Sequence, residues 1–469
     1  MKLLFASAEI SPFAKSGGLA DISLALSKVL NGRIDVTAIM PLYRCIDKTH
    51  YDICSTGDSF NLSFGGLSYD IELFTTTIDG LKVVFVYNEL LCERDSLYGH
   101  SEEGYEDNDL RFAIFCHTIV EIVKRDFFDI LHLNDWHTAL TALLVRDTGL
   151  STKIVYTIHN LAYQGLFPKS SMVRTGIDPK HFRMEEVEFY GEVNWMKAGI
   201  GNADAVTTVS PSYAVEILTP EFGCGLDGYL RLHSEKLTGI LNGIDTKLFD
   251  PSTDPALPAT YSKTSKRGKM VCKKSFFREI EMEQSTLPLF IFIGRFVEQK
   301  GLELIIESIE EMLKRPLVFV MLGDGENKYH SALQKVAQKK FNFHLHFGYD
   351  ETLAHKMYAA ADFLVMPSLF EPCGLNQMVA MRYGTIPLVH KTGGLKDTIH
   401  QIIPRKRVCG MGFVFNKMKK DLFLQSIDSA IKLYGNRRKL NSIRTFNMSC
   451  DFSIQKCAKE YLKLYESLL

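Results

Sequence analysis

The sequence lacks two features that would have pointed to a membrane or nucleic-acid protein. Its 469 residues carry a formal net charge of -1, so no global basic field attracts nucleic acid or anionic lipid. Its strongest apolar runs, such as residues 287–293, are far shorter than the roughly 18 residues that a membrane span requires. We therefore expect a soluble protein without nucleic-acid or membrane partners.

Paired cysteines and metal-ligand clusters are also missing. None of the 10 cysteines belongs to a CxxC pair, and most, like Cys116 and Cys272, lie in apolar stretches, which predicts reduced thiols in a cytoplasmic protein. No cluster of His, Cys and Asp has metal-ligand spacing, so no metal site and no cofactor is predicted. The first eight residues resemble a signal peptide, but the apolar run is short and Glu9 follows, which favours a buried first strand.

Short β-rich runs alternate with helical patterns along almost the whole chain. The expected strands are 3–7, 35–39, 82–86, 130–133, 154–158 and 205–209, then 289–293, 317–321, 344–347, 363–366 and 386–389. This rhythm predicts an α/β fold with parallel, doubly wound sheets covered by helices on both faces. Such sheets bind ligands at the carboxyl ends of their strands.

A polar stretch, 250–274, interrupts this rhythm and divides the chain into two halves. It contains three prolines and a run of lysines and arginines, and we interpret it as a solvated linker rather than a binding patch. The expected domains are 1–245 and 246–452, followed by an amphipathic helix over 453–469. Two sheets facing each other would place one cleft between them, where we expect the chemistry.

Each half contains a glycine pair that opens a helical pattern. Lys15 precedes Gly17 and Gly18 in the first half, and Thr392 precedes Gly393 and Gly394 in the second. Free backbone N–H groups at a helix start can bind an anion, and Lys15 would add a full charge. A tight turn explains one such pair, whereas two pairs suggest one phosphate-bearing ligand. The GxGxxG match at 223–228 follows no strand, so we interpret it as a loop.

Polar residues follow several expected strands. Asp135, Trp136 and His137 follow strand 130–133, and His159 and Asn160 follow strand 154–158. We favour a functional role for His159 and a core position for His137. Arg295 and Lys300 follow strand 289–293 and could clamp a diphosphate, or could simply form a surface turn. Glu371 lies in a proline-flanked turn after strand 363–366, a placement typical of ligand binding.

These motifs, taken in order, resemble the bacterial glycogen synthase and plant starch synthase family. The matching segments are 15–21, 134–137, 157–160, 239–245, 294–296, 371–375 and 392–395. The resemblance implies a GT-B fold with two Rossmann-like domains facing a deep interdomain cleft, and a final helix that returns to the first domain. It also implies transfer of glucose from ADP-glucose, or UDP-glucose, to the non-reducing end of an α-1,4-glucan with retention of configuration and without a metal.

The resemblance also implies roles for individual residues. The catalytic set would be His159, Glu371, Lys300, Arg295 and Asp135. The donor would contact Lys15, Gly17, Gly18, Asp21, Asn242, Arg295, Lys300, Tyr349, Glu371, Cys373, Gly374, Thr392, Gly393 and Gly394. Trp136 and Asn160 would lie on the acceptor side.

The expected mechanism is a same-face displacement. Retaining glycosidases use two carboxylates, whereas only Glu371 is well placed here and the resemblance gives it a sugar-binding role. The leaving phosphate would then take the acceptor's proton. Two alternatives are a GT-B protein that binds glucan without catalysis and a GT-B transferase with another acceptor. Phe249 departs from the family's expected Trp, and the absence of a transit-like leader favours the bacterial branch.

Overall fold

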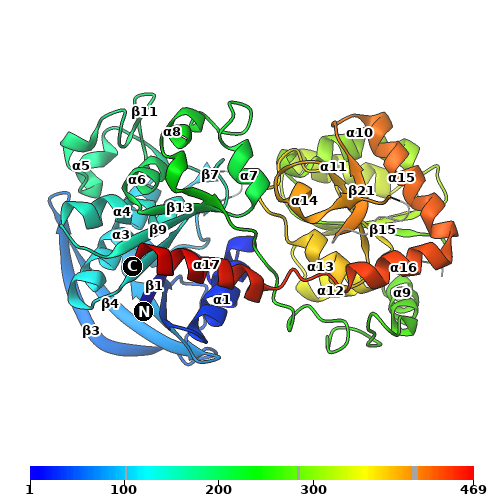
Figure 1. The fold of residues 1–469 in the computed structure, drawn as a ribbon, viewed down its shortest axis with the longest axis horizontal. Helices are drawn as coiled ribbons and strands as arrows, with labels where there is room; N and C mark the ends of the chain where they lie inside the picture. Colours follow the sequence, from blue (N-terminus) through cyan, green and yellow to red (C-terminus); the bar gives the residue numbers. More distant parts are fainter. Residues whose placement is uncertain (101–102, 283–285, 404–409) are drawn as a thin grey trace. The chain divides into compact units, whose positions relative to one another are not determined.

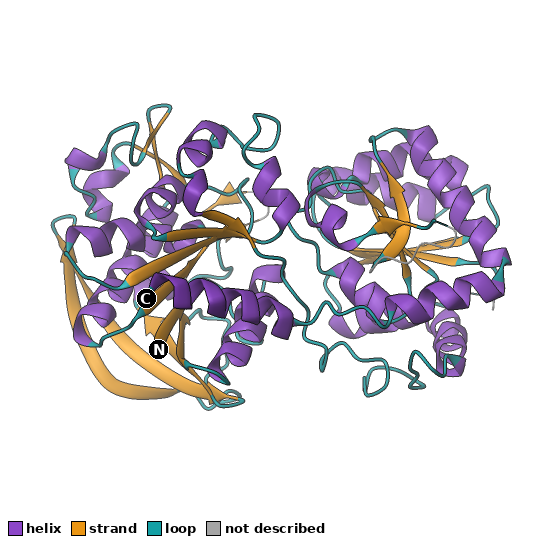
Figure 2. Cartoon of the chain, viewed as in Figure 1, coloured by secondary structure: helices purple, strands orange, loops and turns teal. Residues whose placement is uncertain are grey.

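The computed structural model describes residues 1–100, 103–282, 286–403 and 410–469. The chain divides into two compact units, Met1–Leu241 with Ile454–Leu469, and Asn242–Ser453. The bounds expected from the sequence, at 245 and 452, lie a few residues away. Each unit contains its own sheet with helices packed against it (Figures 1 and 2).

The main sheet of the first unit has the strand order β14-β13-β9-β8-β1-β2-β5-β4-β3. Its strands are β1 Lys2–Ala6, β2 Asp35–Pro41, β3 Cys54–Phe64, β4 Leu67–Ile78, β5 Leu81–Tyr87, β8 Ile130–Asn134, β9 Lys153–Ile158, β13 Ala205–Thr208 and β14 Leu237–Gly239. The strands from β14 to β5 pair in parallel, and β4 and β3 extend the sheet as an antiparallel hairpin. The carboxyl ends of the parallel strands therefore share one edge.

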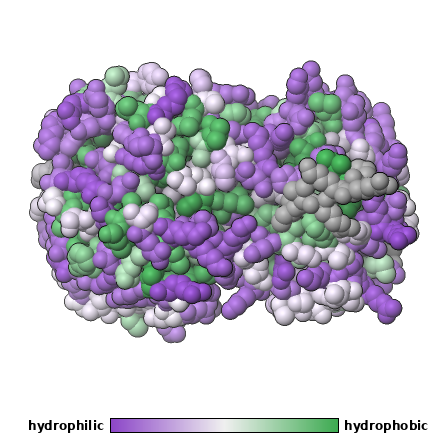
Figure 3. Space-filling model, viewed as in Figure 1, coloured by the Kyte–Doolittle hydropathy of each residue, from purple (hydrophilic) through white to green (hydrophobic). Residues whose placement is uncertain are grey.

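Helices and two small β-elements complete the first unit. The helices are α1 Gly18–Asn31, α2 Glu89–Cys92, α3 Asn108–Arg125, α4 Trp136–Asp147, α5 Ser171–Thr175, α6 Trp195–Asn202, α7 Pro211–Glu216, α8 Asp227–Leu232 and α17 Ile454–Leu468. The short strands are β6 Gly99–His100, β7 Glu103–Gly104, β10 Leu166–Pro168, β11 Glu188–Phe189 and β12 Glu192–Asn194. Helix α17 buries Tyr461 and Tyr465, while hydrophilic side chains cover its outward face (Figure 3).

The sheet of the second unit has the order β17-β16-β15-β18-β19-β21-β20, and its strand pairs are parallel. The strands are β15 Leu289–Ile293, β16 Val318–Gly323, β17 Phe343–Phe347, β18 Phe363–Met366, β19 Ile386–His390, β20 His400–Gln401 and β21 Met411–Phe415. The helices are α9 Arg267–Glu279, α10 Leu302–Met312, α11 Asn327–Ala337, α12 Glu351–Ala360, α13 Asn376–Arg382, α14 Gly393–Thr398, α15 Lys420–Gly435 and α16 Arg437–Asn447. One apolar core, rich in Phe, Leu and Ile, joins sheet and helices.

The strands expected from the sequence are confirmed to within a few residues, because buried parallel strands are continuous apolar runs that stand out. The β3–β4 hairpin was not predicted. Most of β3 is exposed and polar, so it carries too little hydrophobic alternation to be recognised. The GxGxxG stretch is a turn that leads into α8 without a preceding strand, as interpreted.

The interpretation of 250–274 as a solvated linker is wrong for its last part. Helix α9 begins at Arg267 and buries Lys269, whose Nζ donates to the carbonyl oxygens of Tyr358, Ala359 and Tyr383 at 3.2, 3.0 and 2.9 Å. The ammonium thus meets carbonyls at the ends of α12 and α13, where the helix dipole favours a cation. Lys274 remains exposed, as a solvated charge should.

The burial of Lys269 leads to a stability prediction. Burial lowers its pKa well below the usual lysine value. Lys269→Met keeps the aliphatic stem but removes the ammonium from the buried Ala359 carbonyl, while the Tyr358 and Tyr383 carbonyls keep one hydroxyl donor each. We therefore expect a loss of about 2–3 kcal/mol of unfolding free energy. Lys274→Met, on the exposed face of the same helix, should change stability by less than about 0.5 kcal/mol. Urea unfolding measures both; equal effects would show that Lys269 is not a helix cap.

Candidate functional site

The glycine turn of the first unit leads from β1 into α1. Gly17 precedes the helix in an extended conformation without a side-chain cap, and α1 begins at Gly18. Lys15 Nζ lies 2.8 Å from Asp21 Oδ1, and each side chain is about one quarter exposed. Lys15 therefore stands at the glycine turn as a charge paired with a carboxylate in the first turn of α1, and its contact with a donor phosphate stays a prediction.

A buried carboxylate that the sequence analysis missed holds this turn in place. Glu9 is 3% exposed and accepts hydrogen bonds from the backbone N–H of Ser16 at 2.5 Å and from its hydroxyl at 2.6 Å. The Tyr98 hydroxyl donates to the same carboxylate at 2.6 Å. The sequence feature that could have indicated this role is the position of Glu9, a charged residue directly after an apolar strand.

Asp135 occupies an unusual backbone conformation immediately after β8. Its φ is 57° and its ψ is -177°, a region that residues other than glycine rarely adopt and that often marks a functional position. Its Oδ1 accepts from the N–H groups of His159 at 2.7 Å and Asn160 at 3.4 Å. Burial raises the pKa of Asp135 to about 7, so the side chain can gain or lose a proton near neutral pH.

His159 lies beside Asp135 at the end of β9. Its Nε2 is 2.9 Å from Asn134 Oδ1, and Asn134 Nδ2 donates to the Ala6 carbonyl at 2.9 Å. Because an amide oxygen can only accept, Nε2 carries the proton and Nδ1 has a lone pair. Burial lowers the pKa of His159 to about 3. The ring is therefore neutral, and Nδ1 can accept a hydrogen bond from a ligand hydroxyl.

The neighbouring aromatic residues form a core cluster. His137 is buried and stacks on Trp136 at 4.1 Å, with Phe112 at 4.8 Å. Burial lowers the pKa of His137 to about 3, which fits the core position that we favoured. Trp136 is only partly buried. Asn160 Oδ1 accepts from the backbone N–H of Ala162 at 3.1 Å, so this side chain orders its own loop.

In the second unit, Lys300 and Glu371 form one ion pair. Lys300 ends the 3-10 turn Glu298–Lys300 after β15, and Glu371 lies in the loop after β18. Lys300 Nζ is 2.9 and 2.8 Å from the two oxygens of Glu371, which is 5% exposed. Ser368 Oγ donates to the same carboxylate at 2.9 Å. The sequence interpretation gave Lys300 to a diphosphate alone; in the structure its first role is to compensate a buried carboxylate.

Backbone packing brings these two loops together. Gly301 has a φ of 72°, and a Cβ at this position would lie 1.9 Å from the Pro367 carbonyl oxygen, so only glycine fits. The N–H of Leu369 donates to the Gln299 carbonyl at 2.9 Å. Arg295 lies in the same loop as Lys300, and its side chain is exposed. The contact explains how residues 71 positions apart in sequence meet.

The second glycine pair packs against the Glu371 loop. The N–H of Gly394 donates to the Glu371 carbonyl at 3.0 Å, and a Cβ on Gly394 would lie 2.3 Å from the Cys373 carbonyl oxygen. The expectation that Gly394 offers its N–H to a phosphate is therefore wrong, because the loop already occupies that donor. The glycine is needed for close packing instead. Gly393 begins α14 with a φ of 42°.

The remaining predicted donor residues differ in their surroundings. Thr392 Oγ1 and Asn242 Oδ1 are buried, and neither has a hydrogen-bond partner among the residues that the structure describes. Such atoms are rare in proteins and suit a ligand that would satisfy them. Cys373 is buried, and Gly374 has a φ of 72°. Tyr349, which follows β17, is 72% exposed and thus accessible to a nucleotide base.

The structure therefore gathers the predicted residues into two sets. The first unit contributes a hydrogen-bonded set of Asp135, His159, Asn134 and Asn160, together with the Lys15–Asp21 pair. The second contributes a charged set, Lys300 and Glu371, with the glycine turn behind it. Ser368 and Asn134, which orient Glu371 and His159, were missed: the partner of Asn134 is 25 residues away, and Ser368, three residues before Glu371, has no pattern that sets it apart from an ordinary turn serine.

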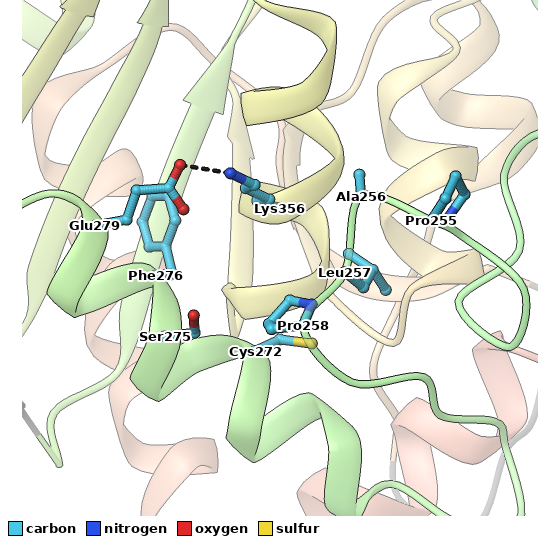
Figure 4. Close-up of a pocket in the computed structure, with 9 residues that line it drawn as sticks. All are labelled: Pro255, Ala256, Leu257, Pro258, Cys272, Ser275, Phe276, Glu279 and Lys356. Carbon is cyan, nitrogen blue, oxygen red and sulfur yellow. Dashed lines mark hydrogen bonds and ion pairs between the residues drawn. The ribbon is translucent and has the colours of Figure 1, made fainter.

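A pocket of about 300 Å³ lies elsewhere in the second unit. Its lining comes from the segment 255–258, from α9 and from Lys356, which pairs with Glu279 (Figure 4). It contains none of the predicted site residues. In the described parts of the chain, no group of three or more His, Cys, Asp or Glu could hold a metal ion. No helix in those parts is long and apolar enough to cross a membrane.

Comparison with protein families finds two matches in the chain. The starch synthase catalytic domain family matches residues 2–232, and glycosyl transferases group 1 matches residues 273–443. The chain is 43% identical over 472 residues to a glycogen synthase of Aquifex aeolicus, covering 100% of this chain and 99% of that protein. It is 38% identical over 476 residues to glycogen synthase 2 of Geobacter sulfurreducens, covering 99% and 98%.

Solved structures agree with this similarity. The catalytic domain of starch synthase IV from Arabidopsis thaliana, bound to ADP and acarbose, superposes with a TM-score of 0.93 at 34% identity, covering 99% of this chain and 98% of that one. A sucrose-phosphate synthase from Thermosynechococcus elongatus superposes with a TM-score of 0.63 at 16% identity, covering 100% and 98%. The second likeness concerns the fold alone.

The raised pKa of Asp135 predicts a pH-dependent stability. Between the unfolded pKa of about 3.9 and the folded value of about 7, the folded chain holds a proton that the unfolded chain has released, so wild-type stability falls as pH rises. Asp135→Asn keeps the acceptor oxygen and tolerates positive φ but cannot ionise. From about pH 5 to pH 7, its stability relative to wild type should rise on the order of 2–3 kcal/mol.

Urea unfolding of both proteins at several pH values measures this difference. Asp126→Asn, at a side chain that is 57% exposed, is the matched control and should show no such trend. A constant difference between wild type and Asp135→Asn would mean that Asp135 is ionised over the whole range.

Proposed function

Because the chain belongs to the glycogen and starch synthase family of GT-B glycosyltransferases, we propose that it transfers glucose from ADP-glucose to the non-reducing end of an α-1,4-glucan with retention of configuration. The glycogen synthases similar to this chain over its whole length support the acceptor. The ADP bound to the similar starch synthase supports the donor. UDP-glucose is the alternative donor.

The observation that carries this proposal is the ion pair between Lys300 and the buried Glu371, after the carboxyl ends of β15 and β18. Glu371 keeps lone pairs that can accept hydrogen bonds from sugar hydroxyls, and Lys300 and Ser368 fix its orientation. Lys300 has protons beyond those that face the carboxylate, so it can also meet the donor's diphosphate. Arg295 would add a second cation, and Thr392 Oγ1 would gain the partner that it lacks within the described residues.

The first unit supplies neutral groups to the same reaction. His159 Nδ1 would accept a hydrogen bond from a glucosyl hydroxyl, and Asp135 would hold the His159 backbone through its N–H. As the glycosidic bond breaks, positive charge develops on the sugar and negative charge on the diphosphate. Positioned cations stabilise that diphosphate, and its oxygen would take the acceptor's proton. Trp136 and Asn160 stay predicted acceptor contacts.

Two other functions are alternatives for a chain with a GT-B fold. A glucan-binding protein without catalysis would not need the cations, yet Lys15, Arg295 and Lys300 are all present in the sequence, as is Glu371. A transferase with another acceptor, a lipid or a small sugar, is disfavoured because the similar proteins are glycogen synthases. Independence from metal ions and a cytoplasmic location stay predictions.

A direct assay tests the donor and the acceptor. The chain is incubated with radiolabelled ADP-glucose or UDP-glucose and with glycogen, and label in polymer is counted. We expect label from ADP-glucose in glycogen, released by an α-1,4-specific amylase. Replacing glycogen by a lipid or a monosaccharide should abolish transfer. Transfer to these acceptors, or none to glycogen, would contradict the proposal. The same assay in EDTA should give undiminished incorporation.

Glu371→Gln should separate catalysis from nucleotide binding. The proposed contacts of this carboxylate are to the sugar, so turnover should fall by on the order of 100-fold, while ADP affinity, measured by calorimetry, should change little. Ser368→Ala removes one donor to the same carboxylate and should have a smaller effect on turnover. If Glu371→Gln weakens ADP binding as much as turnover, the carboxylate serves the nucleotide and not the sugar.

A further inference from the structure

Helix α17, the last helix of the chain, contacts a buried polar network in the first unit. His132 on β8 has both ring nitrogens occupied: Nδ1 lies 2.7 Å from the Tyr465 hydroxyl and Nε2 lies 2.7 Å from Thr157 Oγ1. Thr157 Oγ1 lies in turn 2.6 Å from Thr207 Oγ1. These four residues are fully buried, so each polar atom depends on the others for its hydrogen bonds.

A second tyrosine of α17 joins the network more loosely. The Tyr461 hydroxyl lies 3.4 Å from Thr157 Oγ1 and 3.3 Å from Thr207 Oγ1. Its ring lies 5.2 Å from the ring of His132. The helix thus reaches three adjacent strands, β8, β9 and β13, from one face of the sheet.

Burial lowers the pKa of His132 to about 3, and the electrostatic influence of His159 contributes. The ring is therefore neutral, with one donor and one acceptor nitrogen. One of its two hydroxyl partners must accept from the ring, and the other must donate to it. Removing the Tyr465 hydroxyl would leave a buried ring nitrogen unsatisfied, and the ring or its strand would have to shift.

The network lies two residues before the candidate site on both strands. Side chains alternate between the faces of a strand, so His132 shares a face with Asn134 on β8. On the neighbouring strand, Thr157 lies two residues before His159, which directly follows the end of β9. Asn134 and Thr157 are register partners, and Asn134 in turn bonds His159 Nε2 at 2.9 Å. Strands locked at His132 and Thr157 therefore fix where the Asn134–His159 hydrogen bond forms.

We propose that Tyr465, assisted by Tyr461, is a positioning residue for His159, acting through the buried His132–Thr157–Thr207 network. The site of the first unit is then complete only when the last residues of the chain have folded against it. The catalytic consequence rests on the proposed function of His159, whereas the positioning itself does not.

The first test needs no substrate. Histidine-labelled protein gives imidazole NMR signals, and the signal of His159 is assigned by its loss in His159→Ala. Tyr465→Phe should shift the His159 signal, whereas Lys463→Ala, on the exposed face of α17, should leave it unchanged. An unchanged His159 signal in Tyr465→Phe would overturn the proposal, whatever reaction the protein catalyses.

The second test is a double-mutant cycle on glucan transfer. Tyr465→Phe should lower kcat on the order of 10-fold by misplacing His159, and Tyr461→Phe should lower it less. If the effect passes through His159, Tyr465→Phe should cost nothing further in a His159→Ala background. Additive losses would show that Tyr465 acts elsewhere and would overturn the proposal.

A stability control separates positioning from simple loosening of the helix. Ala458→Gly, at a buried position of α17, destabilises the helix without removing a hydroxyl. It should lower Tm as Tyr465→Phe does, yet leave the His159 signal and kcat near wild type. If Tyr465→Phe does not fold, Thr207→Val removes the neighbouring hydroxyl and should shift the His159 signal. If the wild-type protein transfers glucose from no donor, the proposed function is refuted. The NMR result then still decides whether Tyr465 positions His159.

Discussion

The buried carboxylate of Glu371 is the constraint around which the second unit is arranged. A carboxylate that is 5% exposed must be compensated, and Lys300 and Ser368 do so through hydrogen bonds at 2.8–2.9 Å. The contact in turn requires the loops after β15 and β18 to touch, which only a glycine at 301 permits. The turn that contains Gly394 packs against the same loop, because the N–H of Gly394 donates to the Glu371 carbonyl. One charge thus determines the conformation of three separate loops.

The two units differ in the groups that surround their principal site residues. The second retains an ion pair, Lys300 with Glu371, where its strands end. In the first, burial shifts the pKa values of Asp135 and His159 toward the neutral form, to about 7 and about 3. This division fits the proposed reaction, since a diphosphate needs cations and a sugar ring needs neutral hydrogen-bonding groups.

Lysines and tyrosines far from either set fix the elements that carry them. Lys269 meets the carbonyl ends of two helices in the second unit, one of which, α13, follows the Glu371 loop. Tyr465 contacts β8 next to the strand ends of the first unit. In both cases a polar group is buried only because every partner is present. Residues outside the candidate site therefore also help to fix the positions of the strands and helices that carry it.

The strand positions, the two-unit plan and the residues at the strand ends could all be predicted from the amino-acid pattern alone. Buried parallel strands are short apolar runs, and the residue after such a run lies at the ligand-binding edge, so His159, Asp135 and Glu371 could be selected by position. The sequence also carried the resemblance to the glycogen and starch synthases, because the motifs recur in order.

The hydrogen-bond and ion-pair partners of these residues could be identified only from the folded chain. The sequence allowed the N–H of Gly394 to be interpreted as an open donor and Lys269 as part of a solvated run. Both interpretations failed for the same physical reason. A pairing across many residues depends on which loops and helix ends pack together, and local patterns of charge and glycine contain no record of that distant partner.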